Sequence, residues 1–444
     1  MTFGMAIALF VVAAAGIWLA VAAFVPGDGR KRLILVTWFG LAVAPFVASP
    51  LIWGNTDVNS LPISAITSLT LLLIAGLALS LRNNRRFPPS LKPYAVASIA
   101  LWIGMIVCNL GAGAPTELRA ISGGLALVVV FLTVEESKWP LTGLLWGLIA
   151  LTVISLILGF TNELAWTKDM QRFPLPIEPP VNGRLLGLSF SPNHLGYIAG
   201  LVIVIQILGP KTRLPAIPVV SVAALTVLYS GSRSTLLGLA VAAAASVLIG
   251  QRRSIIWWLT GAAVALTSWI LISDSLKVAG HVDTLNGRTV IWNAVLNSFG
   301  SHQVFGIGPG GWSRLVDAYH LPAYAVEGHN QVIDTIGKQG AIGLVVLAAW
   351  LVVAVLTIKR LQGRDRVLPT ALLGFMVGRS VFEVPLDVYF IGPGTISIAA
   401  FAAAAAWSPV RAAAKVPRAA DQRPTGQPAG TGYSLPRSIT PRGL

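Results

Sequence analysis

Long apolar runs, separated by short polar connections, make up most of the chain. Each run is close to the ~20 residues that an α-helix needs to cross a hydrocarbon core of ~30 Å. The pattern therefore predicts an all-α, polytopic membrane protein with about 12–13 transmembrane helices. The apolar runs are residues 3–25, 33–53, 61–81, 93–110, 118–134, 140–160, 193–209, 216–230, 234–250, 254–273, 333–357, 367–384 and 388–408.

Basic residues cluster in alternate connections, which predicts the orientation of the helices. By the positive-inside rule, the side that carries these clusters is cytoplasmic. We therefore expect the connections 54–60, 111–117, 161–192 and 274–332 on the outer side, together with the N-terminus. The connection 135–138, with two glutamates and one lysine, fits this pattern poorly. The basic clusters are Arg30-Lys31-Arg32, Arg82 with Arg85, Arg86 and Lys92, Lys211 with Arg213, Arg252-Arg253, and Lys359 with Arg360, Arg364 and Arg366.

The composition excludes a soluble globular protein. Of the 444 residues, 55% are hydrophobic and 11% are charged, and the mean hydropathy is +0.75, which are values typical of membrane proteins. The net charge of +15 lies in clusters between apolar runs, so it indicates topology rather than a nucleic-acid partner. The single cysteine, Cys108, lies in an apolar run and has no partner for an internal disulfide.

Four regions follow from the layout. Residues 1–273 hold the first ten helices with an outer loop at 161–192, and residues 274–332 form a long extracytoplasmic loop that we expect to be catalytic. Residues 333–408 hold the last three helices. Residues 409–444, rich in Pro, Gly, Ala and Arg, are expected to form a disordered, basic cytoplasmic tail.

The long outer loop ends in a polar run that contains His329. This histidine lies where the loop meets the next apolar run, with Asn330, Asp334 and Lys338 following at helical spacing on one face. A long loop of this kind has little structural use in a membrane protein. Histidine titrates near neutral pH, so His329 is the candidate general base.

Three arginines on the predicted outer side are candidate anion-binding residues. Arg184 precedes Asn193 and a helix that Ser191 is expected to cap, and the free N–H groups of such a helix favour an anion; a snorkelling anchor is the alternative. Arg233 follows a Ser-Gly-Ser turn and enters an apolar run, where a cation usually faces a polar cavity or an anionic partner; a tight turn with a snorkelling arginine is the alternative. Arg288 lies at the start of a short amphipathic helix, on the same face as Trp292, Val295 and Phe299.

Two further features have structural interpretations. The glycine run at residues 306–311 lacks a preceding strand, so it is not a dinucleotide fingerprint; it predicts close backbone packing beneath a cavity. Arg379 and Glu383, spaced i, i+4, are expected to pair as a buried strut.

Four segments together resemble the O-antigen ligase and Wzy-type polysaccharide polymerase superfamily. They are "NGRLLGLSFSPNHLGY", "YSGSRSTLLGLAV", "GRTVIWNAVLNSF…VFGIGPGGW" and "GHNQVIDTIGKQGAIGL", within residues 182–345. The family's members are multi-pass proteins of bacterial cell envelope biogenesis, inverting glycosyltransferases of the GT-C kind. They use undecaprenyl-diphosphate-linked glycans on the outer face of the plasma membrane.

The resemblance implies a role for each candidate residue. It puts His329 in the role of the base that deprotonates the acceptor hydroxyl, and Arg184, Arg233 and Arg288 in the role of diphosphate ligands. The expected partners are the lipid-linked glycan donor, a glycan, lipid or wall-polymer acceptor, and membrane lipids. Ligase and polymerase both fit the resemblance, because they differ only in the acceptor.

The chemistry is consistent with this resemblance. A polyprenyl diphosphate leaves with negative charge that cationic side chains can stabilise, so no cofactor and no metal are expected. The sequence has no Asp-x-Asp pair, and its five histidines do not fall at metal-ligand spacing. Asp57, in the first outer loop, is the alternative base. The alternative function is a transporter or flippase for the lipid-linked glycan, although no internal repeat of the kind found in transporters is evident.

Overall fold

The computed structural model describes residues 29–48, 87–115, 119–167, 183–211, 214–249, 288–321, 325 and 327–407. Apart from the two-residue strands β1 (Trp166–Thr167) and β2 (Arg184–Leu185), the regular structure there is helical. The α-helices are α2 (Gly29–Val43), α5 (Lys92–Gly111), α6 (Arg119–Thr133), α7 (Trp139–Thr161), α8 (Pro192–Leu208), α9 (Ala216–Ser230), α10 (Arg233–Leu248), α12 (Arg288–Phe299), α13 (Trp312–Ala318), α14 (Gln331–Arg360), α15 (Val367–Ser380) and α16 (Pro393–Ala406). Short 3₁₀ turns are η1 (Ala44–Ala48), η2 (Pro89–Leu91), η3 (Glu163–Ala165), η5 (Pro309–Gly311) and η6 (Gly363–Arg366).

The fold confirms the prediction of an all-α, polytopic membrane protein. Within the described ranges, three helical segments are both long and apolar enough to cross a bilayer, namely Pro89–Gly111, Trp139–Thr161 and Gln331–Arg360. Shorter apolar helices include Pro192–Leu208, Ala216–Ser230 and Arg233–Leu248. The predicted runs 3–25, 61–81 and 254–273, the loop residues up to 287 and the tail from 409 lie outside the described residues, as does Asp57.

Two predicted runs end or begin elsewhere in the structure because of proline. In the described part of the run 33–53, the α-helix ends at Val43 and tightens into η1, since Pro45 disfavours the α conformation of the residue before it. The run 388–408 is helical only from Pro393, which occupies the first helical position, where its missing N–H is tolerated. In the run 367–384, the helix ends at Ser380, before the predicted end of the run.

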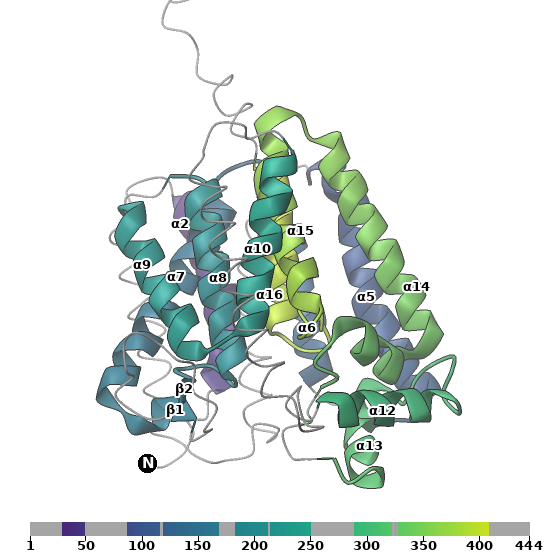
Figure 1. Cartoon of the computed structure of the whole chain (residues 1–444). Helices are drawn as coiled ribbons and strands as arrows, with labels where there is room; N and C mark the ends of the chain where they lie inside the picture. The colour runs from purple at the N-terminus through teal and green to yellow at the C-terminus, as the bar shows by residue number, and fades with distance from the viewer. Residues whose placement is uncertain are drawn as a thin grey trace, which may run out of the picture.

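The helices form a bundle in which neighbours pack through small residues. α14 and α5 lie side by side at one flank, while α10, α15 and α16 fill the middle (Figure 1). At the contact between α2 and α7, a Cβ on Gly143 would lie 2.5 Å from the Leu35 carbonyl oxygen. Close backbone approach of this kind is the usual way in which helices associate where no hydrophobic effect drives them together.

The segment between α15 and α16 is irregular and yet buried. Its backbone N–H groups are satisfied by side chains: Leu386 N–H donates to Gln331 Oε1 at 2.9 Å, and Ile391 N–H donates to Ser122 Oγ at 3.1 Å. Non-helical backbone inside a membrane protein is tolerated only where the protein satisfies it in this way. The segment is thereby fixed, together with Glu383 at its beginning.

Helix α14 is interrupted at Gly340, whose φ of 60° and ψ of −149° are not helical. The loop after α12 docks into this interruption: Ile307 N–H donates to the Gly337 carbonyl at 2.8 Å, and Ala341 N–H donates to the Gln303 carbonyl at 2.8 Å. The backbone groups released by the break are therefore satisfied by the loop. The predicted close packing of the glycine run is present, since a Cβ on Gly306 would lie 2.5 Å from the Gly337 carbonyl oxygen.

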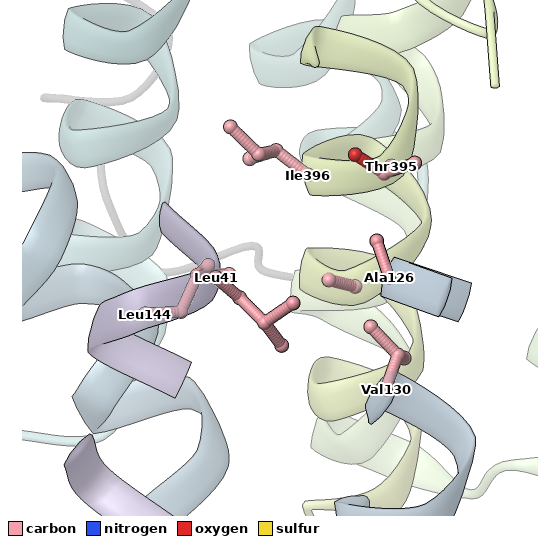
Figure 2. Close-up of a pocket in the computed structure, with 7 residues that line it drawn as sticks. Leu41, Ala126, Val130, Leu144, Thr395 and Ile396 are labelled. Carbon is pink, nitrogen blue, oxygen red and sulfur yellow. The ribbon is translucent and has the colours of Figure 1, made fainter. Parts of the chain in front are cut away.

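A small apolar pocket lies inside the bundle, between α2 and α7 on one side and α6 and α16 on the other (Figure 2). It has no room for a water molecule. Thr395 is the polar residue in its lining, and its hydroxyl is already bonded to the backbone of Gly392. The pocket therefore offers no group for chemistry. Its lining residues are Leu41, Ala126, Val130, Leu144, Thr395, Ile396 and Ala399.

We predict that Gly340→Ala destabilises the fold more than Gly363→Ala. Both glycines have a left-handed φ, +60° and +51°, which costs an alanine about 1–2 kcal/mol. A Cβ at Gly340 would also lie 2.6 Å from the Val304 carbonyl oxygen, whereas none of the described residues lies within 4 Å at Gly363. We expect an additional loss of about 1–3 kcal/mol at Gly340, measured as unfolding free energy in detergent. Equal losses at the two positions would contradict the docking of the loop.

Candidate functional site

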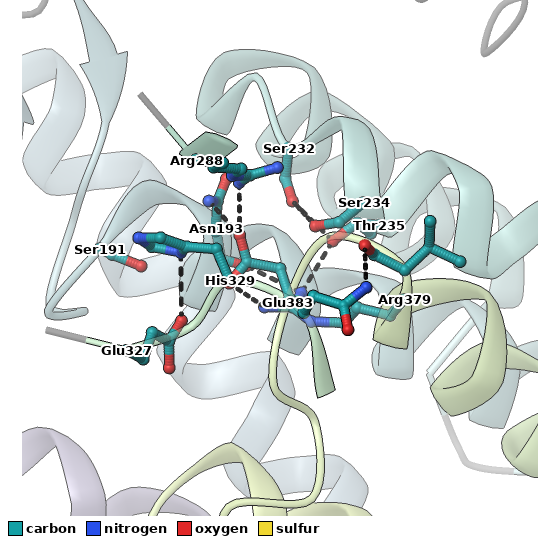
Figure 3. A network of polar contacts seen from close by, with 12 residues as sticks. Ser191, Asn193, Ser232, Ser234, Thr235, Arg288, Glu327, His329, Arg379 and Glu383 are labelled. Carbon is teal, nitrogen blue, oxygen red and sulfur yellow. Dashed lines mark hydrogen bonds and ion pairs between the residues drawn. The ribbon is translucent and has the colours of Figure 1, made fainter. Parts of the chain in front are cut away.

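The candidate site lies at one end of the bundle, where the N-termini of α8, α10, α12 and α14 meet (Figure 3). Figure 1 shows α12, α13 and the two short strands at this same end. Ser191 caps α8 as predicted, accepting the His194 N–H at 3.2 Å. Helix N-termini carry partial positive charge, so their convergence favours a negatively charged ligand.

Arg184 is held at the site by strand β2. Its backbone pairs with Thr167 of β1, and its Nε donates to the Ser230 carbonyl at 2.8 Å. Its Nη2 donates to the side-chain oxygen of Asn193 and, at 3.3 Å, to the Gly231 carbonyl. Arg184 thus joins the turn between α9 and α10 to the first turn of α8.

Glu383 is the centre of the arginine cluster. Its Oε1 lies 3.1 Å from Nη2 of Arg288 and accepts a hydrogen bond from the amide of Asn193. Its Oε2 lies 3.9 Å from Nη2 of Arg379. Glu383 is 1% exposed. Its contacts with Asn193, Arg288 and Arg379 connect α8, α12 and α15.

The predicted pair between Arg379 and Glu383 is therefore present, but Glu383 has partners beyond it. Arg379 is 1% exposed, and its Nη1 donates to the Asn193 carbonyl at 2.9 Å and to Thr235 Oγ1 at 3.1 Å. Its guanidinium lies 4.5 Å from the ring centroid of Tyr197, in a cation–π contact. The pair belongs to the site rather than to a separate strut.

His329 is presented on a left-handed turn immediately before α14. Its φ is 46°, which is an uncommon conformation for a residue other than glycine. Both neighbours are pinned: Gly328 N–H donates to Asp334 Oδ1 at 2.8 Å, and Asn330 caps α14 by accepting the Val332 and Ile333 N–H groups. Trp292 adds a bond of 2.8 Å from Nε1 to the Gly328 carbonyl. The surrounding structure therefore fixes the strained turn.

The His329 ring pairs with Glu327. Nδ1 lies 3.4 Å from Glu327 Oε1, and both side chains are 16% exposed. Burial lowers the pKa of His329, but the contact with Glu327 and the charges of Glu327 and Glu383 outweigh it, so the pKa lies above the ordinary value. Burial raises the pKa of Glu327, but the contact with His329 and the charges of His329, His194 and Lys338 place it below its usual range.

The contact between His329 and Glu327 makes the stability of the fold depend on pH. A histidine pKa that is raised by folding contributes stability that is fully present below about pH 6.5, the ordinary histidine value. The contribution is lost as the pH rises through the raised pKa of His329.

Arg233, the first residue of α10, is exposed, and its charge repels that of Arg288. The structure thus brings all four sequence-predicted residues to one end of the bundle. Arg184 and Arg288 are linked through Asn193 and Glu383, and the charges of Glu383 and Arg288 both act on His329.

The arrangement carries excess positive charge. The arginines of the site, with Arg379 included, number four against the two carboxylates of Glu327 and Glu383. Two positive charges in a partly buried site repel each other, and this is unfavourable unless an anion lies between them. The geometry therefore suits a ligand with two or more negative charges beside a titratable histidine. The four arginines are Arg184, Arg233, Arg288 and Arg379.

One group of side chains at the site has metal-ligand geometry. His194, Glu327 and Glu383 each offer a ligand atom, and these atoms lie within 4.8 Å of one another. However, Glu383 is occupied by Arg288 and Asn193, and Glu327 pairs with His329. A cation at this position would have to displace these partners beside buried guanidinium groups, so the residues fit a metal poorly.

A buried charged triad supports the loop that carries His329. Lys338 Nζ lies 3.0 Å from Asp334 Oδ1 and 3.0 Å from Asp387 Oδ2, and it lies 5.3 Å from the ring centroid of Trp312. The predicted polar face of α14 is present for Asp334 and Lys338, while Asn330 caps the helix instead. On α12, Val295 is fully buried together with Ile291 and Ala294, whereas Trp292 is half-buried.

Sequence reasoning missed the site roles of Glu327 and Asn193. Glu327 lies two residues before His329 in "EGHN", which is a detectable signal for a carboxylate–histidine pair. Asn193 is the second residue of α8. Its distance from Arg184 along the sequence gives no indication that the two side chains are in contact. The link from Glu383 to Arg288 spans 95 residues and has no local signal.

The fold and the site define a polytopic α-helical membrane protein with a cluster of arginines beside a histidine. A protein-family model described as O-antigen ligase matches residues 218–348. This match confirms the resemblance to the O-antigen ligase and polysaccharide polymerase superfamily. The matched segment contains Arg233, Arg288 and His329, whereas Arg184, Arg379 and Glu383 lie outside it. Comparison with curated proteins gave no match.

We predict that Lys338→Met destabilises the protein by about 3–5 kcal/mol, because it leaves two buried carboxylates without their cation. The matched control is Lys359→Met, near the exposed end of the same helix, where surface substitutions typically change stability by about 0.5 kcal/mol or less. Unfolding of both variants in detergent, followed by circular dichroism, measures the difference. A Lys338→Met variant as stable as the control would show that the triad does not support the loop.

Proposed function

We propose that this protein is a glycosyltransferase of the O-antigen ligase or polysaccharide polymerase kind. It transfers a glycan from an undecaprenyl-diphosphate-linked donor to an acceptor hydroxyl at the outer face of the plasma membrane. The observation that carries the proposal is the convergence of His329 with the arginine cluster around the buried Glu383 at one end of the bundle. The family match, which indicates an enzyme of the glycosyltransferase or ligase kind, supports it.

The arginines hold the diphosphate of the donor. As the bond between the sugar C1 and the diphosphate oxygen breaks, negative charge grows on the leaving group. Guanidinium groups stabilise this charge, and their forked donors match phosphate oxygens in pairs. Arg288 and Arg233 are the more accessible ligands, while Arg184 positions Asn193 and the turn before α10.

His329 acts as the general base. Its neutral ring accepts the proton of the acceptor hydroxyl as that oxygen forms a bond to C1, and the diphosphate leaves with the electron pair of the broken bond. Attack from the side opposite the leaving group inverts the configuration at C1. Glu327, paired with Nδ1, orients the ring and stabilises the imidazolium that forms.

The charge distribution supports an outer location of the site. His329 immediately precedes α14, whereas Lys359 and Arg360 end this 30-residue helix and Arg364 and Arg366 follow it. The part of α14 from the break at Gly340 to Arg360 still covers roughly the 30 Å of a hydrocarbon core, so we expect the basic connection and the site at opposite membrane surfaces. The positive-inside rule then places the basic connection in the cytoplasm and the site outside.

The proposed step requires no metal, because Arg288 and Arg233 supply positive charge at the leaving group. We therefore expect transfer to continue in chelator, and added Mg²⁺ or Mn²⁺ to have no effect. Glu327 and Glu383 act in this account through their ion pairs and hydrogen bonds.

We predict that His329→Asn lowers turnover about 10²–10⁴-fold, the usual contribution of a general base. Asparagine tolerates the left-handed conformation, so this variant removes the base and preserves the turn. The rate of the wild-type enzyme should fall as the pH drops through a value above about 6.5, because the pKa of His329 is raised.

Glu327→Gln should move that inflection to lower pH, since burial then dominates the pKa of His329. The measurement is transfer from a purified lipid-linked donor in nanodiscs across pH 5–9. Equal turnover in folded His329→Asn protein removes histidine from the mechanism and makes Asp57 the candidate base.

We predict that Arg288→Ala raises the KM for the donor at least tenfold, and that Arg288→Lys recovers only part of the loss, because lysine lacks the forked donors. The matched control is Arg314→Ala, an exposed arginine of α13 that bonds to the Gly113 carbonyl at 3.3 Å. Steady-state kinetics with varied donor concentration measure the effect. An unchanged KM in Arg288→Ala would remove this residue from the diphosphate site.

A further inference from the structure

The buried carboxylate of Glu383 occupies Arg288, one of the arginines that the proposed function assigns to the donor. It is tightly paired on one side and loosely paired on the other: Oε1 lies 3.1 Å from Arg288, whereas Oε2 lies 3.9 Å from Arg379. A distance of 3.9 Å is longer than a hydrogen bond. Glu383 therefore lies between two cations and forms a hydrogen bond with Arg288 but not with Arg379.

Arg379 is fixed and has unused capacity. Asn193, Thr235 and the ring of Tyr197 hold its guanidinium in place. Its Nε is buried and has no hydrogen-bond partner among the residues that the structure describes. A shift of Glu383 by about 1 Å would turn the loose ion pair into a charge-assisted hydrogen bond of ordinary length.

Arg288 is the member of the cluster that is placed to change partners. It is the first residue of α12, and its side chain is 18% exposed, compared with 1% for Arg379. Besides its contact with Glu383, Arg288 lies beside Phe382, whose ring centroid is 5.8 Å from the guanidinium. It can turn toward a ligand without disturbing the helix core.

We propose that Glu383 is an internal competitor of the donor's diphosphate. Without ligand, it neutralises Arg288; when the diphosphate binds, Arg288 turns to the phosphate oxygens and Glu383 closes onto Arg379. This inference rests on the proposed function and names the residue that sets donor affinity and product release.

The exchange avoids leaving a buried charge unpaired at any stage. Glu383 keeps Arg379 and the Asn193 amide as partners while Arg288 changes anion. A buried carboxylate without a partner would be strongly unfavourable. After transfer, the return of Glu383 to Arg288 helps to expel the diphosphate of the spent lipid, so the competitor limits product inhibition.

The two possible roles of Glu383, structural strut and competitor, predict opposite effects of its removal on the affinity for the diphosphate. If Glu383 only positions the arginines, its removal weakens diphosphate binding. If it competes with the diphosphate, removal of its charge strengthens binding, because the repulsion between two anions disappears. Glu383→Gln keeps the shape and can still accept hydrogen bonds, while Glu383→Asp keeps the charge but withdraws it from Arg288 by one methylene.

The experiment is equilibrium binding of undecaprenyl diphosphate to the purified protein in nanodiscs, together with turnover. We expect Glu383→Gln to bind it about tenfold more tightly and to turn over more slowly, because product release becomes limiting. Glu383→Asp should show the same direction with a smaller change. The control, Glu163→Gln, alters an exposed acid of η3 and should match the wild type.

The outcomes separate the two claims. Weaker binding in the glutamate variants, with wild-type binding intact, overturns the competitor while the proposed function stands. If Glu383→Gln does not fold, the direction found in Glu383→Asp decides between competitor and strut. Absence of binding in the wild type and in the variants overturns the proposed function and the competitor with it.

Discussion

The ion pairs of the Glu383 carboxylate are the interaction on which the site depends. Burying a guanidinium is unfavourable unless an anion and hydrogen-bond acceptors accompany it. Glu383 is the anion that lies between Arg288 and Arg379, and Asn193 joins the same network to Arg184. Because these residues come from β2, α8, α12 and the end of α15, a single buried carboxylate determines how these elements meet.

The second requirement is a fixed position for His329, and backbone geometry provides it. The break of α14 at Gly340 receives the loop that follows α12, so that α12 and the base of α14 are held together. The buried triad around Lys338 then ties Asp334, and through it the Gly328 N–H, to the segment between α15 and α16. The backbone that carries His329 and Arg288 is thus held in place at one end of the bundle.

The sequence predicts the helices well because a membrane helix needs a long apolar run, and such runs are visible without a structure. It also makes His329 and the three arginines candidates for the site, since charges next to apolar runs are unusual. Helix bounds are misplaced where proline acts, as at Pro45 and Pro393. The contact of Glu383 with Arg288 is invisible in the sequence because it depends on how distant helices pack. The local spacing of Arg379 and Glu383 predicts an ion pair between these two residues. It gives no sign that Arg288 is a further partner of Glu383.

The central claim is that the cluster breaks the bond between a glycan and its lipid diphosphate, rather than moving the intact donor across the bilayer. The most direct measurement uses purified protein in liposomes with a donor labelled on both its lipid and its glycan. The account predicts acceptor-dependent release of free undecaprenyl diphosphate, in amounts equal to the glycan transferred. Movement of the doubly labelled donor between leaflets without any bond cleavage would contradict the account and establish a transporter.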